Sequence, residues 1–545
     1  MRKQASLTFL LLVFLSSSFA QSQNFTHQDS IRGSITSERA WWDLTYYHLQ
    51  IKVDIANKSF TGQNAIYYTV LEPSKRLQVD LQPPLKITKV MQGKEELPFT
   101  QDGNAYYVSF NTPQKKGNKN SIVVFYEGNP HVSVRPPWGG GVTWSKDDNG
   151  NDFIATTCQG DGASLWWPCK DHMYDEPDSM LISITVPKHL TNVSNGRLRS
   201  VVKNKDKTRT FNWFVSNPIN NYGVNINIGD YVRFSEIYTG EKGDLDCDYY
   251  VLSYNLDKAK KQFKDAARTL QAFEHWFGPY PFYEDSYKLV EAPYLGMEHQ
   301  SSVTYGNGYQ NGYLGRDLSQ TGWGLQWDFI IVHETGHEWF ANNITYKDIA
   351  DMWIHESFTA YSENLFLDYH YGKEASAEYV IGTRQNIQND KPIIGPYGVN
   401  KLGSGDMYYK GANMLHTLRQ LVDDDDKWRN ILRGLNKEFY HQTVTTQQIE
   451  DYISQQSGKD LSAFFNQYLR DTRIPVLEYV IKGSRLQYRW SQVVQNFDMP
   501  VIIYINGKKE WVFPSAQWNR KEIREHITDV KVDVNFYVAT FNLEG

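Results

Sequence analysis

The stretch that decides how this chain is organised is "IIVHETGHEWFANN", residues 330–343. Apolar residues flank it on both sides, which predicts a helix buried inside a domain. His333 and His337 are four residues apart, so on a helix they share one face. Two imidazoles on one face can hold a single Zn²⁺ at about 2.0–2.1 Å each. The stretch therefore predicts a mainly helical domain built around a metal site.

Glu334 follows the first histidine directly and lies on the flank of the same helical face. A carboxylate there can accept a proton from a zinc-bound water, whose pKa falls to about 7. The H-E-x-x-H pattern also arises by chance in chains of this length. Because the flanks are apolar, however, the two histidines need partners inside the protein, and a metal supplies them.

A catalytic zinc needs a third protein ligand. Glu356, in "DMWIHESFTAYSE", is separated from His337 by 18 residues. A helix, a connection and a second antiparallel helix fit that length. His355, next to it, and Glu363, two turns further on, are the alternatives. We expect His333, His337 and Glu356 to bind one Zn²⁺ per chain.

Composition indicates a globular, multidomain protein. The chain has 545 residues, 40% of them hydrophobic and 22% charged, which differs from disordered sequences. The net charge of -6 gives no electrostatic footprint for nucleic acid. The run of four aspartates at 423–426 suggests a solvated loop. The three cysteines favour buried free thiols over a bridge between Cys158 and Cys169.

The periodicity of the apolar residues changes twice along the chain. Strand-like alternation runs from about Thr36 to Phe234, helical spacing starts near Leu256, and strand-like alternation returns after Pro475. This order predicts a multidomain α+β protein. The predicted parts are a signal peptide (1–20), an all-β domain (21–236), a mainly α catalytic domain (237–472) and a small β-domain (473–545).

The first twenty residues read "MRKQASLTFLLLVFLSSSFA". Arg2 and Lys3 precede an apolar run, and small residues up to Ala20 follow it, which is typical of a secretory signal peptide. The apolar run is too short to span a membrane. We therefore predict an exported, soluble protein, periplasmic or extracellular, without an integral membrane segment after cleavage.

Five motifs occur in an order that resembles the zinc aminopeptidase (gluzincin) family, which includes aminopeptidase N and leukotriene hydrolase. They span most of the mature chain: "CQGDGASLWWPCKDHMYDEP" (158–177), "FGPYPF" (277–282), "LGMEHQ" (295–300), the zinc motif with "WIHESFTAY" (353–361), and "MYYKGANML" (407–415). The resemblance implies a saddle-like N-terminal β-domain, a thermolysin-like catalytic domain and a β-sandwich-like C-terminal domain. It suggests a short bacterial-type exported member without the family's helical C-terminal domain.

The resemblance also implies roles for single residues. Glu298 would bind the free α-amine of a peptide substrate through a charge-assisted contact, helped by Gln159. Gly296 and Met297 would line the substrate beside it. Tyr408 would donate a hydrogen bond to the oxyanion, and its neighbour Tyr409 is the alternative. With Glu334 as the base, the implied activity is hydrolysis of the first peptide bond by a zinc-dependent aminopeptidase.

The chain departs from the family pattern at several positions. Leu295 and His299 replace a glycine and an asparagine of the family's G-A-M-E-N motif. Gln159 occupies the position of a second acid, and Asp161 is near enough in sequence to replace that acid. Only about seventy residues follow Pro475, so the site is either more open than in larger relatives or covered by a partner subunit. The sequence is therefore compatible with an oligomer.

Three other functions fit part of the sequence. A zinc endopeptidase of the thermolysin type shares the two histidines and a downstream glutamate. The 18-residue gap and the segment around Glu298 favour the exopeptidase instead. A non-catalytic peptide-binding protein would lack a ligand or the base, and both are present. Activity on lipid epoxides, as in the leukotriene hydrolase branch, has no specific support in the sequence.

Overall fold

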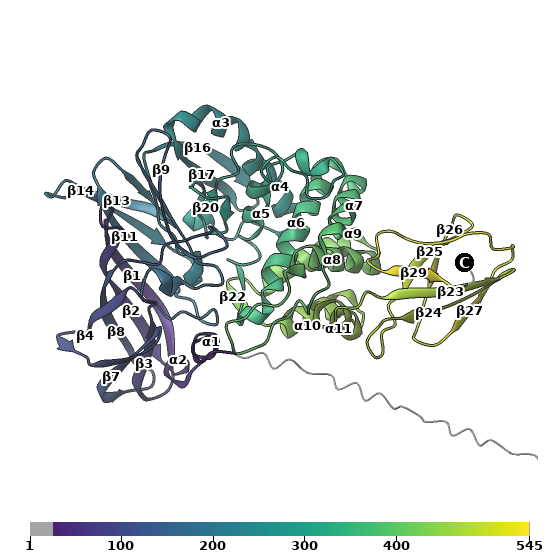
Figure 1. Cartoon of the computed structure of the whole chain (residues 1–545), viewed down its shortest axis with the longest axis horizontal. Helices are drawn as coiled ribbons and strands as arrows, with labels where there is room; N and C mark the ends of the chain where they lie inside the picture. The colour runs from purple at the N-terminus through teal and green to yellow at the C-terminus, as the bar shows by residue number, and fades with distance from the viewer. Residues whose placement is uncertain (1–24, 544–545) are drawn as a thin grey trace, which may run out of the picture.

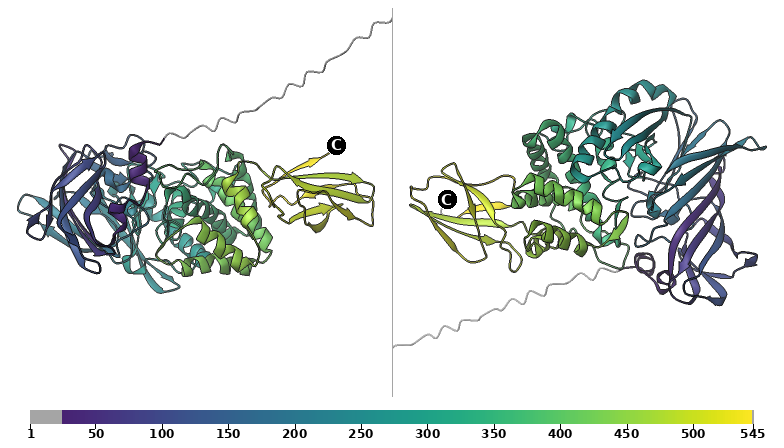
Figure 2. Two further views of the ribbon diagram at one scale, coloured as in Figure 1. Left: turned by 90° about the horizontal axis from the view of Figure 1, so that it is seen from below. Right: turned by 180° about the vertical axis from the view of Figure 1, so that it is seen from behind.

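The computed structural model describes residues 25–543. The predicted signal peptide lies outside these residues. Three regions follow one another in space (Figure 1): a strand-rich N-terminal part, a helical middle and a small C-terminal group of strands. Two further views place the C-terminal strands and the N-terminal sheets on opposite sides of the helices (Figure 2). The fold is thus a multidomain α+β architecture, as predicted.

An eight-stranded sheet forms the body of the N-terminal region. Its strands run in the order β13-β14-β11-β1-β2-β8-β4-β5. Inward-facing residues of β2, such as Ile66 and Tyr68, alternate with more exposed ones, which is the two-residue period of a sheet with one buried face. The bounds are β1 (Trp42–Asp54), β2 (Ser59–Val70), β4 (Lys86–Gln92), β5 (Glu95–Glu96), β8 (Lys119–Gly128), β11 (Ser179–Pro187), β13 (Arg197–Lys203) and β14 (Thr208–Val215).

Two smaller sheets and two short helices complete this region. One sheet has the order β3-β7-β6 and the other β12-β15-β10-β9. The segment that follows β10 carries Gln159 toward the helical region. The bounds are α1 (His27–Gly33), α2 (Ser37–Ala40), β3 (Ser74–Asp80), β6 (Phe99–Asp102), β7 (Ala105–Gln114), β9 (Gly141–Lys146), β10 (Asp152–Thr157), β12 (Thr191–Val193) and β15 (Asn227–Gly229).

The middle region contains a five-stranded sheet in addition to its helices. Its order is β16-β17-β18-β20-β19. Helical spacing after Leu256 correctly indicates the helices that follow, but the short strands after residue 286 are buried along their whole length and show no alternation. The bounds are β16 (Tyr231–Gly240), β17 (Gly243–Leu252), β18 (Tyr287–Glu291), β19 (Gly296–Met297) and β20 (Val303–Tyr305). The domain boundary predicted between residues 236 and 237 falls inside β16. The division into domains remains a prediction.

Nine α-helices of the described chain make up the rest of the middle region. They are α3 (Leu256–Gln262), α4 (Lys264–Phe277), α5 (Phe329–Gly336), α6 (Trp353–Tyr371), α7 (Lys373–Gly382), α8 (Tyr409–Val422), α9 (Asp425–Glu438), α10 (Thr446–Ser457) and α11 (Ser462–Arg470). The short strands β21 (Ile344–Tyr346) and β22 (Gln442–Val444) pair in parallel.

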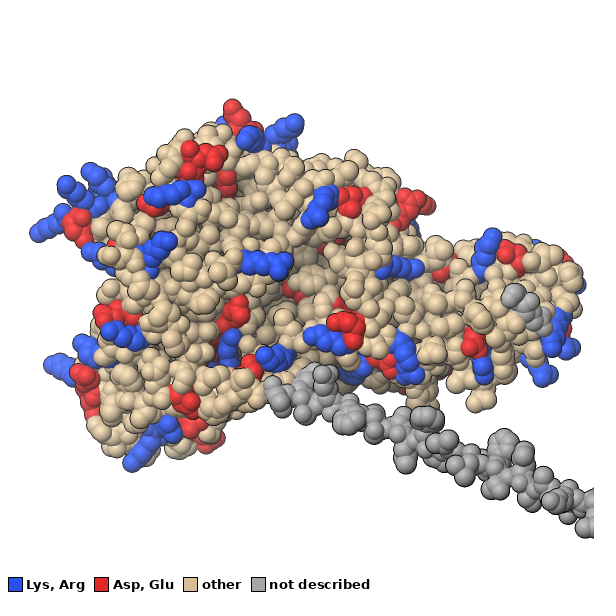
Figure 3. Space-filling view, viewed as in Figure 1, with Lys and Arg blue, Asp and Glu red and all other residues tan. Residues whose placement is uncertain are grey.

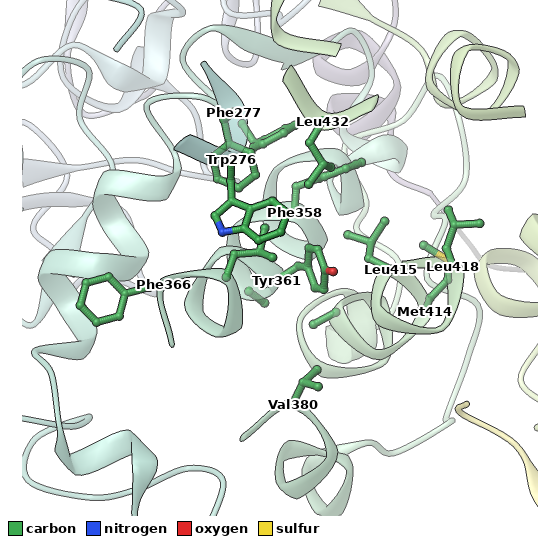
Figure 4. Packing of buried hydrophobic residues seen from close by; sticks show 14 of the residues in the cluster. Trp276, Phe277, Phe358, Tyr361, Phe366, Val380, Met414, Leu415, Leu418 and Leu432 are labelled. Carbon is green, nitrogen blue, oxygen red and sulfur yellow. The ribbon is translucent and has the colours of Figure 1, made fainter. Parts of the chain in front are cut away.

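Aromatic and aliphatic side chains pack around α6, the helix that carries Glu356. Figure 4 shows them between the helices: Trp276 and Phe277 of α4, Phe358, Tyr361 and Phe366 of α6, Val380 of α7, Met414, Leu415 and Leu418 of α8, and Leu432 of α9. All are buried in one continuous core. A closely packed core of this kind fixes the position of α6, because core side chains have little room to shift.

The aspartate run at 423–426 is only in part the solvated loop that its charge suggested: Asp423 and Asp424 are exposed and connect α8 to α9, whereas the next two begin α9. Asp424 caps α9 by accepting a hydrogen bond from the backbone of Lys427 at 2.9 Å, and the next two aspartates lie in the first helical turn. Asp425 forms ion pairs with Arg419 and Lys373. The run occupies a helix N-terminus, where negative charge is stabilised.

The C-terminal region consists of two sheets, ordered β27-β24-β23-β29 and β26-β25-β28. It packs onto α11 through Tyr468, whose hydroxyl donates to the carbonyl of Tyr537 at 2.8 Å. The bounds are β23 (Val476–Lys482), β24 (Arg485–Ser491), β25 (Val501–Ile505), β26 (Lys508–Val512), β27 (Asn519–Glu522), β28 (Val530–Val532) and β29 (Ala539–Asn542).

Acidic and basic side chains are interspersed on the face shown in Figure 3. Within residues 25–543, no helix is both long and apolar enough to cross a membrane. Cys158, Cys169 and Cys247 are all buried and free, which confirms the prediction of unpaired thiols. Burial raises the pKa of each thiol, so all three remain protonated at neutral pH.

Candidate active site

Two antiparallel helices bring three metal-ligand side chains together. His333 lies near the end of α5, His337 follows its last turn, and Glu356 lies in the first turn of α6. One possible ligand atom from each residue lies within 4.8 Å of the others. Glu356 Oε2 is 3.4 Å from His337 Nε2 and 3.9 Å from His333 Nε2. The sequence predicted this cluster.

The Nδ1 atom of each histidine lies within hydrogen-bond distance of another residue. His333 Nδ1 is 2.8 Å from Glu363 Oε1, and the hydroxyl of Tyr379 donates to Glu363 Oε2 at 2.7 Å. His337 Nδ1 lies 3.0 Å from the carbonyl oxygen of Phe340. Such outer contacts fix the ring so that Nε2 faces the metal.

The remaining donor atoms fit a zinc ion. Glu356 is 1% exposed, and its Oε2 has no hydrogen-bond partner in the described chain. A buried carboxylate oxygen without a partner is costly unless a cation binds it. Two imidazoles and one carboxylate are a donor set typical of catalytic zinc. His333, His337 and Glu356 are therefore suited to hold Zn²⁺.

The two alternative ligands have other contacts. His355, beside Glu356, accepts a hydrogen bond from the backbone N–H of Tyr346 at 3.0 Å. Glu363 contacts His333 from behind, on the side of Nδ1. Glu363 comes seven residues after Glu356, two turns along the same helical face. This spacing could have indicated the supporting contact, but Glu363 was considered only as an alternative ligand.

Glu334 lies in the site beside His337. The carboxylates of Glu334 and Glu298 and a ring nitrogen of His337 lie within 4.8 Å of one another. Burial raises the pKa of Glu334 to about 7, which suits a proton acceptor near neutral pH. A Cβ at Gly296 would lie only 3.0 Å from Glu334 Oε1. Glycine therefore allows β19 to approach α5 this closely.

Gln159 and Glu298 meet at one end of the site. The side-chain nitrogen of Gln159 donates to Glu298 Oε1 at 2.5 Å and to Glu356 Oε1 at 3.0 Å. The backbone carbonyl of Glu298 accepts from Asn342 Nδ2 at 3.0 Å. Burial raises the pKa of Glu298. Asp161 takes no part here, because its carboxylate accepts the backbone N–H of Gly140 at 2.7 Å.

Two residues next to Glu298 point in different directions. Met297 is buried and lines the cleft, with its sulfur 3.5 Å from the hydroxyl of Thr157. His299 is fully buried, and its Nδ1 lies 2.7 Å from the hydroxyl of Thr304. The histidine that replaces the family's asparagine thus packs against strand β20.

Tyr408 directly precedes α8, and its ring stacks near that of His333 with centroids 6.2 Å apart. Burial raises the pKa of its hydroxyl well above the usual value, so the group remains a hydrogen-bond donor. A Cβ at Gly411 would lie 2.0 Å from Ser357 Oγ. Only glycine lets α8 pack this closely on α6, and that contact sets the position of Tyr408.

These side chains line one cleft of about 580 Å³ between the N-terminal and helical regions. Gln159 comes from the first region and the metal cluster from the second. Tyr408 and Tyr409 both line the cleft, as do Gly296, Glu298 and Glu334. The cleft can therefore hold a bound molecule against the metal cluster and the two carboxylates Glu298 and Glu334.

Comparison with known proteins gives two family matches. Residues 261–468 match the peptidase family M1 domain, and residues 44–222 match the peptidase M1 N-terminal domain. The chain is 23% identical to the leucyl aminopeptidase of Saccharolobus solfataricus, over 83% of this chain and 58% of the relative. It is 21% identical to the probable aminopeptidase 1 of Sulfurisphaera tokodaii, over 71% of this chain and 50% of the relative. The chain thus spans about half the length of these curated relatives.

Solved structures share the fold over nearly their whole length. The M1 zinc metallopeptidase from Deinococcus radiodurans has a TM-score of 0.67 at 19% identity, with 82% of this chain and 98% of that chain covered. A mutant of it bound to a Tyr-Ser-Ala substrate gives the same TM-score, with 80% and 96% covered. The two family models together span well over half of the sequence, and the chain belongs to peptidase family M1, the zinc aminopeptidase (gluzincin) family.

Proposed function

We propose that this chain is a zinc-dependent aminopeptidase that hydrolyses the first peptide bond of peptides with a free N-terminus. The observation that carries the proposal is the position of Glu298 and Gln159 beside the metal cluster, at one end of the cleft. An acidic group there binds the ammonium of the substrate's first residue and prevents the peptide from extending further along the cleft. Only the first peptide bond then reaches the metal.

His333, His337 and Glu356 would hold one Zn²⁺ per chain. When bound, zinc polarises a peptide carbonyl and lowers the pKa of a water molecule to about 7. Glu363 and the Phe340 carbonyl keep the two imidazoles oriented toward the ion. Because these outer contacts raise ligand basicity, they also strengthen metal binding.

Glu334 acts as the general base and then as the general acid. Its carboxylate takes a proton from the attacking water and passes it to the leaving nitrogen. Its buried surroundings support this role, since a raised pKa favours accepting and returning a proton near neutral pH. Tyr408 donates a hydrogen bond to the oxyanion that forms on the carbonyl oxygen.

Glu298 and Gln159 recognise the substrate amine together. The side-chain NH₂ group of Gln159 donates hydrogen bonds to two carboxylates, so its side-chain carbonyl oxygen can accept one from the substrate ammonium. A carboxylate facing an ammonium makes a charge-assisted hydrogen bond. Gly296 and Met297 line the bound residue next to Glu298.

A time course with one unlabelled peptide of about ten residues tests the function. Mass spectrometry should show loss of single residues from the N-terminus, abolished by a chelator and restored by Zn²⁺. Internal fragments without stepwise loss would contradict the proposal and indicate an endopeptidase. Glu334→Gln should retain zinc, measured by metal analysis, while losing turnover; an active variant would remove Glu334 as the base.

We further propose that the protein is exported and that its signal peptide is cleaved near Gln21. We also propose that the mature chain is divided into the three domains predicted from the sequence, 21–236, 237–472 and 473–545. The apolar run flanked by Arg2, Lys3 and Ala20 supports the export. N-terminal sequencing of protein from the producing cells, after fractionation, tests it. A mature protein that still begins at Met1 in the cytoplasmic fraction would contradict this proposal.

A further inference from the structure

The cleft has two distinguishable ends. Glu298 and Gln159 lie at the end nearer His337 and Glu356. At the end nearer His333, the lining of the cleft includes the aromatic residues Phe329 and Tyr313. If the amine binds at the first end, the part of the peptide after the cut bond must extend toward the second.

Phe329 and Tyr313 form the core of the second end. The ring of Phe329 stacks on that of His333, with centroids 5.2 Å apart and planes 14° apart. Tyr313 packs edge-on against Phe329 at 5.3 Å. Both residues line the cleft. A contiguous apolar surface therefore starts at the metal ligand and continues outward.

Leu318 and Tyr409 also line the cleft, and Tyr409 lies close enough to Tyr313 for their hydroxyls to interact electrostatically. Together with Phe329 and Tyr313 they form what we call the aromatic wall. Among the described residues that line the cleft there is no lysine or arginine. Glu363, which also lines the cleft, contacts His333 and Tyr379. None of the four side chains of the wall is charged, so the wall offers mainly apolar contacts.

The loop that carries Tyr313 is tied down by backbone hydrogen bonds. Tyr313 and Arg316 exchange two of them, at 2.9 and 3.1 Å, and the N–H of Gly312 donates to the carbonyl of Trp327 at 2.8 Å. The guanidinium of Arg316 lies 5.5 Å from the centre of the Tyr313 ring. The wall is thus in position before a substrate binds, which limits the entropy lost on binding.

We infer that the aromatic wall binds the side chain of the substrate's second residue, the one that leaves with the cut bond, and selects large apolar side chains there. The inference rests on the proposed aminopeptidase function. Burying a large apolar side chain on a preformed apolar wall favours it over alanine by about 10- to 100-fold in kcat/KM. An acidic second residue would lose its hydration on this apolar surface, and Arg316, the cation beside Tyr313, is solvent-exposed and does not line the cleft.

Tripeptides Ala-X-Ala, with X as phenylalanine, leucine, alanine or glutamate, test the inference. Wild-type kcat/KM should rank phenylalanine and leucine above alanine, and alanine above glutamate. The double variant Tyr313→Ala with Leu318→Ala should lower the phenylalanine-to-alanine ratio by roughly ten-fold. Tyr67→Ala, at an exposed tyrosine of β2 far from the cleft, should keep the wild-type ratio.

Binding provides a second measurement that does not need turnover. In a Glu334→Gln background, calorimetry should give tighter binding of Ala-Phe-Ala than of Ala-Ala-Ala, and the difference should vanish with the wall substitutions. A wild-type enzyme that cleaves all four peptides equally would overturn the inference and leave the aminopeptidase function standing. The same holds for a ratio retained in the double variant. If no tripeptide is cleaved or bound, both proposals fail.

Discussion

The side-chain nitrogen of Gln159 lies 2.5 Å from a carboxylate oxygen of Glu298. The two residues are 139 positions apart and come from different regions of the fold. The same nitrogen also reaches Glu356 at 3.0 Å. Gln159 therefore links the group that would bind the substrate amine to a group that would bind the metal.

Removing this link should weaken substrate binding. In Gln159→Ala, Glu298 and Glu356 lose a shared donor, and the substrate ammonium loses an acceptor. We expect KM to rise by about ten-fold, the loss of one charge-assisted hydrogen bond, with a smaller change in kcat. Steady-state kinetics measure this, and metal analysis should find wild-type zinc content. A variant with unchanged KM would show that Gln159 is not part of amine recognition.

Tyr408→Phe should reduce kcat by about 10²–10³-fold, because it removes one hydrogen-bond donor to the oxyanion. Substrate affinity should change little, since the hydrogen bond forms in the transition state. Tyr369→Phe, at an exposed tyrosine of α6 whose ring packs against His275, is the matched control. An effect of Tyr408→Phe on KM alone would reassign the residue to substrate binding.

Glu363→Ala should weaken zinc binding by about 10–100-fold, as loss of a contact to a ligand histidine does. The carboxylate lies 2.8 Å from His333 Nδ1 and orients that ring. Competition with a chromophoric chelator measures the zinc affinity directly. Glu374→Ala, at an exposed position in α7, serves as the control. Equal zinc affinity in both variants would mean that Glu363 only fills space.

Asp328 should be important for stability, because it caps the helix that carries the two histidines. Its carboxylate accepts from the backbone of Ile330 and Ile331 and from the hydroxyl of Tyr305. Asp328→Ala should cost about 2 kcal/mol of unfolding free energy, at the upper end for a cap. Asp424→Ala, at the more exposed cap of α9, should cost less. Thermal melts of the zinc-loaded proteins compare them, and equal losses would contradict this ranking.

Acid should destabilise the protein partly through His416. Burial lowers the pKa of His416 to about 4, helped by Arg419 and Arg384 and opposed by Asn535 and Asp533. The unfolded state takes up a proton near pH 6.5, and the folded state does so only near pH 4. Above pH 6.5 the histidine is neutral in both states and does not reduce the free energy of unfolding. As the pH falls from 6.5 to 4, proton uptake by the unfolded state alone lowers the free energy of unfolding by about 1.4 kcal/mol per pH unit.

The variant His416→Gln isolates this contribution from the protonation of the metal ligands, which affects both proteins equally. Melting temperatures at pH 7.5 and pH 5.0 give the loss for each protein. The wild type should lose more than the variant over this interval. Equal losses would show that His416 does not titrate as its burial implies.

The sequence predicted those parts of the site that depend on local spacing. His333 and His337 are one helical turn apart, and the gap to Glu356 matches two antiparallel helices. The hydrogen bond between His333 and Glu363, and the one from Tyr379 to Glu363, were not predicted, since Glu363 was considered only as an alternative ligand. Gln159 was reached by resemblance alone, because no local pattern connects residues so far apart in sequence.

The fold could be predicted from the sequence to a similar degree. Alternation in long strands such as β2 and helical spacing in α4 identified the three regions. The five-stranded sheet beneath the active site was missed, because its inner strands are short and buried along their whole length. The aspartate run was predicted only in part, since charge alone does not distinguish a solvated loop from a capped helix N-terminus: Asp423 and Asp424 form an exposed connection, and Asp425 and Asp426 begin α9.

The most direct test of amine recognition by Glu298 compares one peptide with its N-acetylated form. Acetylation removes the positive charge that Glu298 and Gln159 are proposed to bind, and changes nothing beyond the first residue. Wild-type kcat/KM should fall by at least about 10²-fold on acetylation, and Glu298→Ala should lose most of this discrimination. Equal cleavage of both peptides at the same bond by the wild type would contradict recognition of the substrate amine by Glu298 and Gln159.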